Sequence, residues 1–165
     1  MPAAARISLL ALLLCGSAQA QTLEGYWQDT ARRILFARAA PPSYAYGAWT
    51  VLDQDQTYPA AKEIRRSADG LAVVDLNFDD GNYKVETISA ADDRVAFVRT
   101  AKWSGCAMHH RCRLEGEAMV CSLVNVCPED GKNIVDWRGE ELYVRRANCE
   151  RQGKVQAQGF PVACH

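Results

Sequence analysis

Residues 106–127 read CAMHHRCRLEGEAMVCSLVNVC, and this stretch decides the fold. Gly116-Glu117 lies between two strand-like runs with the glycine first, as a two-residue type II′ hairpin turn requires. A two-residue turn fixes the register of the hairpin. That register makes four cysteines face one another in two pairs, Cys112 with Cys121 and Cys106 with Cys127. Cα atoms at such non-hydrogen-bonded positions lie about 4.5 Å apart, close enough for a disulfide. We therefore predict two disulfides across one hairpin.

Two cysteines are then left to pair with each other, Cys149 and Cys164, and this third disulfide would tether a polar C-terminal tail. The competing interpretation is a metal site. Segment 106–112 has cysteines around His109 and His110 with a spacing similar to that of zinc ligands, and Met108 and Met119 are soft donors. Adjacent histidines on a strand point to opposite faces, so one metal ion cannot easily use both. We predict no metal and no cofactor, with copper at His110 and the methionines as the alternative.

Other turn signals predict further hairpins along the chain. Asp80-Gly81 lies between the alternating runs 71–79 and 82–89, and Asp-Gly is a strong two-residue hairpin signal. Gly139-Glu140 predicts a second Gly-first hairpin, which would pair Trp137 with Leu142 and Val135 with Val144. Segment 90–93 predicts a turn into the strand that follows. Successive hairpins with short turns are typical of an up-and-down β-meander.

The Asp80-Gly81 turn also predicts which residues face the core. Its register pairs Phe78 with Tyr83 and Leu76 with Val85 on the apolar face, together with Val74 and Thr87. The polar face would carry Asp75, Asn77, Lys84 and Glu86. Asp75, Asn77 and the acidic residues after them also approximate a calcium-binding loop, but the glycine is misplaced by one and the flanks alternate like strands, so we favour the hairpin.

About eight to ten strands fit between residues 25 and 146, and many short, evenly spaced strands predict an all-β barrel or sandwich. We predict an antiparallel up-and-down β-barrel of about eight strands stapled by disulfides, with a β-sandwich as the alternative. One helix is considered over 30–40, ended by Pro41-Pro42. Ile34-Leu35-Phe36 within it is equally consistent with a buried strand.

Residues 1–20 have the features of a cleaved secretory signal peptide: Arg6, an apolar run over 7–14, and small residues ending at Ala20. Residues 21–165 would form one domain, exported to the periplasm or secreted, where thiols oxidise. The apolar run is too short for a membrane anchor. With 19 basic and 20 acidic residues the net charge is −1, which gives no reason to expect nucleic-acid binding.

Catalytic motifs are missing from the sequence. It has no nucleophile elbow and no phosphate-binding glycine loop, and its three histidines are His109, His110 and His165. The carboxylate pairs Asp79-Asp80 and Asp92-Asp93 fall in predicted turns, where acidic residues are common for conformational reasons. We therefore expect no enzyme.

Gly25-Tyr26-Trp27 at the start of the first predicted strand resembles the entry motif of the lipocalins and related calycin β-barrels. The resemblance implies that Trp27 plugs the closed end of a barrel beneath an arginine from a late strand, in a cation–π contact. Arg145 or Arg146 is in the right place to supply it, and Gly25 would allow the close approach. The family's later Thr-Asp-Tyr-type motif has no counterpart, so the resemblance supports a barrel and does not specify a ligand.

A barrel of about eight strands has room for side chains or one small ligand. We expect an exported binding protein that holds a small apolar or amphipathic molecule, lined by Leu76, Phe78, Tyr83 and Val85. The alternative is a protein-binding module, such as an inhibitor or immunity protein of an exported hydrolase. Its contact surface would be the tyrosine-containing loop over residues 41–47.

Overall fold

The computed structural model describes residues 21–39, 46–52, 60–78, 81–153 and 160–165, and every regular element in them is a β-strand. The predicted signal peptide lies outside the described residues. In chain order the strands are β1 (Gly25–Ala37), β2 (Thr50–Val51), β3 (Ala61–Ser67), β4 (Gly70–Asp75), β5 (Tyr83–Ala91), β6 (Arg94–Ala101), β7 (Ala107–Glu115), β8 (Ala118–Glu129), β9 (Lys132–Arg146), β10 (Cys149–Arg151) and β11 (Val162–Cys164).

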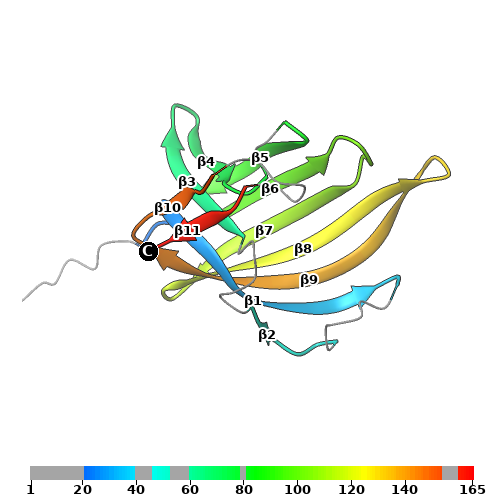
Figure 1. Cartoon of the computed structure of the whole chain (residues 1–165), viewed down its shortest axis with the longest axis horizontal. Coiled ribbons are helices and arrows are strands. Elements are labelled where there is room, and N and C mark those ends of the chain that lie inside the picture. Colours follow the sequence, from blue (N-terminus) through cyan, green and yellow to red (C-terminus); the bar gives the residue numbers. More distant parts are fainter. Residues whose placement is uncertain (1–20, 40–45, 53–59, 79–80, 154–159) are drawn as a thin grey trace, which may run out of the picture.

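Eight of these strands form a nearly closed antiparallel barrel in the order β4-β3-β1-β9-β8-β7-β6-β5 (Figure 1). Apart from the short β2, which pairs with β1, and the seam between β4 and β5, consecutive strands of the barrel pair with each other and β9 pairs back with β1, so the predicted up-and-down barrel is confirmed. The strands β4 and β5 stand at the two ends of this order. Across this seam the Val73 amide donates to Thr87 Oγ1 at 3.0 Å.

The hairpin predicted from residues 106–127 is confirmed. Strands β7 and β8 pair Cys112 with Cys121 in the expected register around the Gly116-Glu117 turn. The structure contains all three predicted disulfides, Cys106–Cys127, Cys112–Cys121 and Cys149–Cys164. The Cα atoms of these pairs are 4.1, 3.9 and 4.1 Å apart. The turn predicted over 90–93 is present but shorter: β5 extends through Ala91, and only residues 92–93 turn, with Ala91 opposite Arg94.

The predicted Asp80-Gly81 hairpin is wrong, because the described strands on its two sides are not paired by backbone hydrogen bonds. Strand β4 ends at Asp75, and among the described residues β4 and β5 share no strand pairing. Asn77 follows the end of β4 in the sequence. Its side chain accepts a hydrogen bond from the Ala61 amide at 2.7 Å and donates one to the Phe160 carbonyl at 3.2 Å. These bonds hold the chain in a turn where a tight hairpin would need it extended.

The two faces of β4 are also the reverse of those predicted. Asp75 is fully buried, on the same face as Leu71 and Val73 in the core, whereas Val74 packs in a separate cluster. The run from Leu71 to Val74 is apolar on both faces, so the sequence does not show which face is inward. The prediction placed the carboxylate in solvent because it did not include a buried cation to pair with it.

The hairpin predicted at Gly139-Glu140 is wrong, because β9 runs through these residues without interruption. The turn is Asp130-Gly131, which joins Glu129 to Lys132, and both turn residues have positive φ angles of 51° and 73°. Gly139 is needed for another reason. A Cβ atom there would lie 2.6 Å from the Arg33 carbonyl oxygen, where β1 has a register shift.

The helix considered over 30–40 is wrong, because β1 covers most of that range as a strand and residue 40 lies outside the described part. Ile34 is buried, but Leu35 and Phe36 are exposed. Two bulges interrupt β1 in its pairing with β9, between Asp29 and Ala31 and between Ile34 and Phe36. Each bulge adds a residue and breaks the two-residue alternation, which is why the apolar positions imitate helical spacing.

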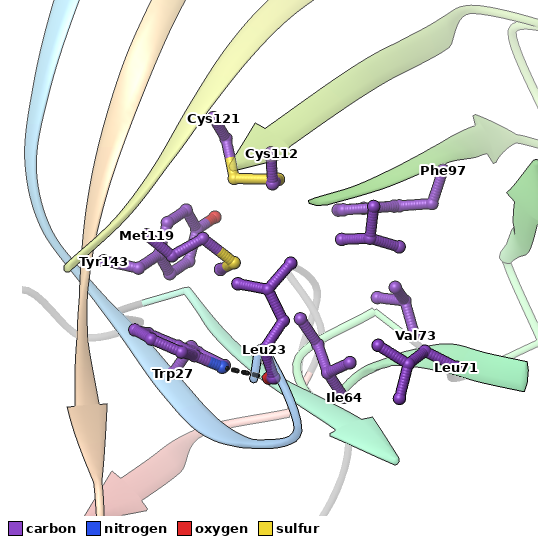
Figure 2. Packing of buried hydrophobic residues seen from close by; sticks show 11 residues of the cluster. Leu23, Trp27, Ile64, Leu71, Val73, Phe97, Cys112, Met119, Cys121 and Tyr143 are labelled. Atoms are coloured by element: carbon purple, nitrogen blue, oxygen red, sulfur yellow. Dashed lines mark hydrogen bonds between the residues drawn. A yellow bond between two sulfur atoms is a disulfide. The ribbon is translucent and has the colours of Figure 1, made fainter. Parts of the chain in front are cut away.

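The main core fills one end of the barrel, which we call the closed end (Figure 2). Here the N-terminal segment continues across the barrel, and the Leu23 amide donates to the Asp92 carbonyl at 2.7 Å. A second cluster lies beneath the β10–β11 hairpin and contains Ala61, Leu76, Cys149 and Val162. The C-terminal tail is therefore a packed hairpin held by the Cys149–Cys164 disulfide.

Candidate functional site

The closed end is built on the motif that suggested a barrel plug. Trp27 is fully buried, and its Nε1 donates to the Leu23 carbonyl at 2.7 Å (Figure 2). Arg145 Cζ lies 4.3 Å from the centroid of the Trp27 ring. Arg145 also donates to the carbonyls of Thr22 and Glu24. A Cβ on Gly25 would lie 2.8 Å from Arg145 Nη1, so the absence of a side chain lets the guanidinium sit there. Arg145, and not Arg146, is the arginine over the tryptophan.

The opposite, open end of the barrel holds a cavity of about 460 Å³. Its walls include four aromatic side chains: Phe78, Tyr83, Trp103 and Trp137. Its polar lining comes from β1, β3, β6, β7 and β9 and consists of Arg32, Lys62, Arg99, His110, Glu141 and Tyr143. Phe78, Tyr83 and Trp103 pack edge to face, with successive ring centroids 4.9 and 4.8 Å apart. The cavity thus combines an aromatic wall with a charged base.

A larger depression of about 860 Å³ lies at the closed end, between the β7–β8 turn and Arg145. Turn residues such as Gly116 and Glu117 border it, and it faces solvent outside the barrel. It encloses no cluster of buried polar side chains. We therefore take the cavity at the open end as the candidate site.

One half of the charged base is centred on Asp75. This carboxylate is fully buried and lies 3.1 Å from Lys62 Nζ and 3.3 Å from Arg99 Nη1. Burial alone would raise the pKa of Asp75, but the positive charges of Lys62 and Arg99 outweigh that effect and hold the pKa below its usual range. Arg99 Cζ also lies 4.1 Å from the ring centroid of Phe78, so this cation joins the charged base to the aromatic wall.

The other half is centred on Glu141, also buried, which accepts hydrogen bonds from Arg32 Nη2 and from the Tyr143 hydroxyl. Arg32 Nη2 also donates to Asp29 Oδ2 at 3.1 Å, so one guanidinium joins two buried carboxyl groups. Burial alone would raise the pKa of Glu141, but Arg32 and the Tyr143 hydrogen bond help to lower it.

Asp29 behaves differently from Glu141. Burial and the negative charge of Glu141 raise the pKa of Asp29 to about 8, although Arg32 acts against them. Its Oδ1 atom is buried without a hydrogen-bond partner. At neutral pH Asp29 is therefore mostly protonated, while Glu141 carries the charge of this pair.

His110 is buried at the base and stacks on Phe97 with ring centroids 4.2 Å apart. Its Nδ1 lies 3.2 Å from the Met108 carbonyl, which only accepts, so Nδ1 carries the proton and Nε2 is left unprotonated. Burial lowers the pKa of His110 to about 3, with a further contribution from Lys62. The imidazole is neutral at any physiological pH.

Two of the four predicted lining residues reach the cavity and two do not. Phe78 and Tyr83 line it together, although no strand ladder pairs them. Val85 packs against the main core, and Leu76 lies in the cluster beneath the C-terminal hairpin. The lining was thus predicted in part. The predicted register placed Leu76 on the inward face, whereas the structure places it beneath the C-terminal hairpin.

The sequence did not indicate the charged base, because a single charged residue on a strand usually faces solvent. One weak signal was available. In β3, Lys62 and Ile64 share a face, and both are almost fully buried. An apolar residue two positions from a lysine indicates that the lysine shares the buried face, provided that a carboxylate lies opposite.

The candidate metal ligands are not brought together. His109 is exposed and His110 is buried, as expected for adjacent residues on a strand. In the ranges that the structure describes, no group of three or more His, Cys, Asp or Glu side chains is placed to hold a metal ion. Asp79-Asp80 lies outside the described residues, and Asp92-Asp93 is an exposed turn in which Asp93 pairs with Arg94.

The proposed loop over 41–47 lies largely outside the described residues, apart from Tyr46 and Gly47, both exposed.

Within the described ranges there is no helix with the length and apolar character needed to span a membrane. No family model, curated protein or solved structure matches this chain.

Proposed function

We propose that this protein is an exported carrier that binds one small amphipathic molecule in the cavity at the open end of its barrel. The observation that supports this most strongly is that the core fills only one end, while the other encloses about 460 Å³ beside aromatic and charged side chains. Small-molecule sites typically have volumes of about 300–1,000 Å³ with mostly apolar walls and a few placed polar groups.

The charged base favours an amphipathic over a purely apolar ligand. An apolar molecule that reached Lys62, Arg99 and Glu141 would displace their water without replacing its hydrogen bonds, which is costly for charged groups. A ligand with one polar end avoids this cost while its body contacts the aromatic wall. The lining would include Phe78 and Tyr83 of the residues expected from sequence.

The proposal includes export, so the carrier would act in the periplasm or outside the cell. The three disulfides are consistent with an extracellular or periplasmic protein, since disulfides persist in oxidising compartments. The signal-like residues 1–20 support the same location. A protein partner is the alternative, and the described residues of its proposed loop over 41–47 are Tyr46 and Gly47, both exposed.

The binding proposal can be tested with 1-anilinonaphthalene-8-sulfonate, a fluorescent amphipathic probe. We expect one saturable site per molecule in the oxidised protein. Ala60→Phe places a ring in the cavity that Ala60 lines and should weaken binding about tenfold or more. Ala90→Phe, on an exposed position of β5, is the matched control and should bind as the wild type does. Equal binding by both variants, or no saturable site, would contradict the proposal.

A further inference from the structure

Cations outnumber carboxylates among the described residues that line the cavity. These residues include three cations, Arg32, Lys62 and Arg99, and one carboxylate, Glu141. A second ionised carboxylate, Asp75, lies behind Lys62 and Arg99 and pairs with both. Lys62 and Arg99 therefore share one carboxylate between them.

Asp29 does not restore the balance at neutral pH. Burial and Glu141 raise its pKa to about 8, so it is mostly uncharged where the other two carboxylates are ionised. His110 is neutral as well. Lys62 and Arg99 are thus largely buried with one shared carboxylate, Asp75, and an incompletely paired buried charge is unfavourable.

Arg99 is the cation best placed to bind a ligand. Its Nη1 has Asp75 as partner, but among the described residues Nη2 has only the Met108 thioether sulfur, at 3.5 Å. A thioether is a weak acceptor, whereas a guanidinium fork is suited to two carboxylate oxygens. The side chain of Arg99 is 14% exposed and that of Lys62 only 1%, so Arg99 is the more accessible of the two cations that pair with Asp75.

We propose that the polar end of the ligand is a carboxylate, which accepts hydrogen bonds from Arg99 at the base of the cavity while an apolar body lies along Phe78, Tyr83 and Trp103. This inference rests on the proposed function and specifies the chemistry of its ligand. A ligand carboxylate would supply a second negative charge beside Lys62 and Arg99 and a stronger acceptor than the Met108 sulfur. The contact between Arg99 and Phe78 places the cation directly beside the aromatic wall that would hold the apolar body.

Three probes of the same size and shape separate the two proposals: 4-phenylbutyrate, 4-phenylbutan-1-ol and 4-phenylbutylamine. Their binding to the oxidised protein is measured by calorimetry at neutral pH and low salt. We expect the carboxylate to bind about tenfold or more tightly than the alcohol, since hydrogen bonds between charged groups are the strong ones. The amine should bind most weakly.

The outcomes are distinguishable. Equal affinity for carboxylate and alcohol, or a preference for the amine, would overturn the carboxylate proposal and leave the cavity as a binding site. Failure of all three probes to bind, together with failure of the fluorescent probe, would overturn the proposed function itself.

Two substitutions at Arg99 locate the preference. Arg99→Met should abolish the advantage of the carboxylate over the alcohol while the alcohol still binds, and Arg99→Lys should retain part of it. Arg94→Met is the control, because Arg94 lies on the same strand, is exposed and pairs with Asp93 away from the cavity. If Arg99→Met keeps the wild-type preference, Arg99 is not the carboxylate's partner. If Arg99→Met does not fold, the comparison of Arg99→Lys with the wild type and the three-probe series still decide the question.

Discussion

His110 shows how the barrel interior changes the chemistry of one side chain. Its folded pKa of about 3 is below the ordinary value of 6.5, so between these pH values the unfolded chain holds a proton that the folded chain does not. The contribution of a neutral buried His110 to stability is therefore complete above about pH 6.5 and is lost as the pH falls toward 3. Lys62, Arg99, Asp75 and Glu141 are the charged groups that act on it.

His110→Gln removes this dependence. The variant should be less stable than the wild type at pH 7, because it loses the stacking on Phe97. The difference in the free energy of unfolding between the wild type and this variant should shrink by about 1 kcal/mol for each pH unit below 6.5. Urea unfolding of the proteins with intact disulfides measures this difference. His109→Gln, next to it but exposed, should show a constant difference from the wild type, and a constant difference for His110→Gln would contradict the assignment.

Asp29 has the opposite dependence. Its folded pKa of about 8 exceeds the ordinary value of 3.8, so the folded chain holds a proton that the unfolded chain has released. This contribution is complete below about pH 3.8 and is lost as the pH rises to about 8. Asp29→Asn, which is neutral at every pH, should therefore gain stability relative to the wild type by about 1 kcal/mol per pH unit across that window. A difference independent of pH would show that the pKa of Asp29 is not raised and that Asp29 is ionised at neutral pH. The exposed Asp69→Asn is the control.

Strands and turns were predictable where one turn fixed a register and a second observation agreed with it. The β7–β8 hairpin satisfied this condition, because its turn aligned two pairs of cysteines at once. For the turns predicted at Asp80-Gly81, after β4, and at Gly139-Glu140, within β9, no second observation agreed with the turn residues. Gly139 was taken for a turn, although it is required where β1 and β9 come into close contact, and Asp130-Gly131, a strong turn signal, was overlooked.

Gly139→Ala tests the role of that glycine. The added Cβ would lie 2.6 Å from the Arg33 carbonyl oxygen and 3.0 Å from the Trp137 ring, so the strands must separate. We expect a loss of roughly 2–4 kcal/mol in the free energy of unfolding. Gly131→Ala is the matched control, since its positive φ is strained but nothing lies within 4 Å, and it should cost about 1 kcal/mol. A Gly139→Ala cost no larger than the control would disprove close contact.

The whole molecule is a barrel that is packed at one end and hollow at the other. Its class, its disulfides and the Gly25–Trp27–Arg145 plug could be predicted, because they follow from turn chemistry, cysteine register and one short motif. The charged base could not be. Lys62 and Asp75 face each other across the β3–β4 hairpin, but Arg99 of β6 reaches Asp75 only when the barrel closes, and nothing local in the sequence marks that contact.

The four tryptophans provide the most direct test that the hollow end is the binding site. Trp103 and Trp137 line the cavity, Trp27 is buried in the closed end, and Trp49 lies at the surface beside Arg33. The measurement is a titration of 4-phenylbutyrate followed by the four indole N–H signals in two-dimensional ¹H–¹⁵N NMR. We predict saturable shifts of the Trp103 and Trp137 signals while those of Trp27 and Trp49 stay in place. Shifts confined to Trp49, or equal shifts of all four signals, would contradict a ligand site inside the open end of the barrel.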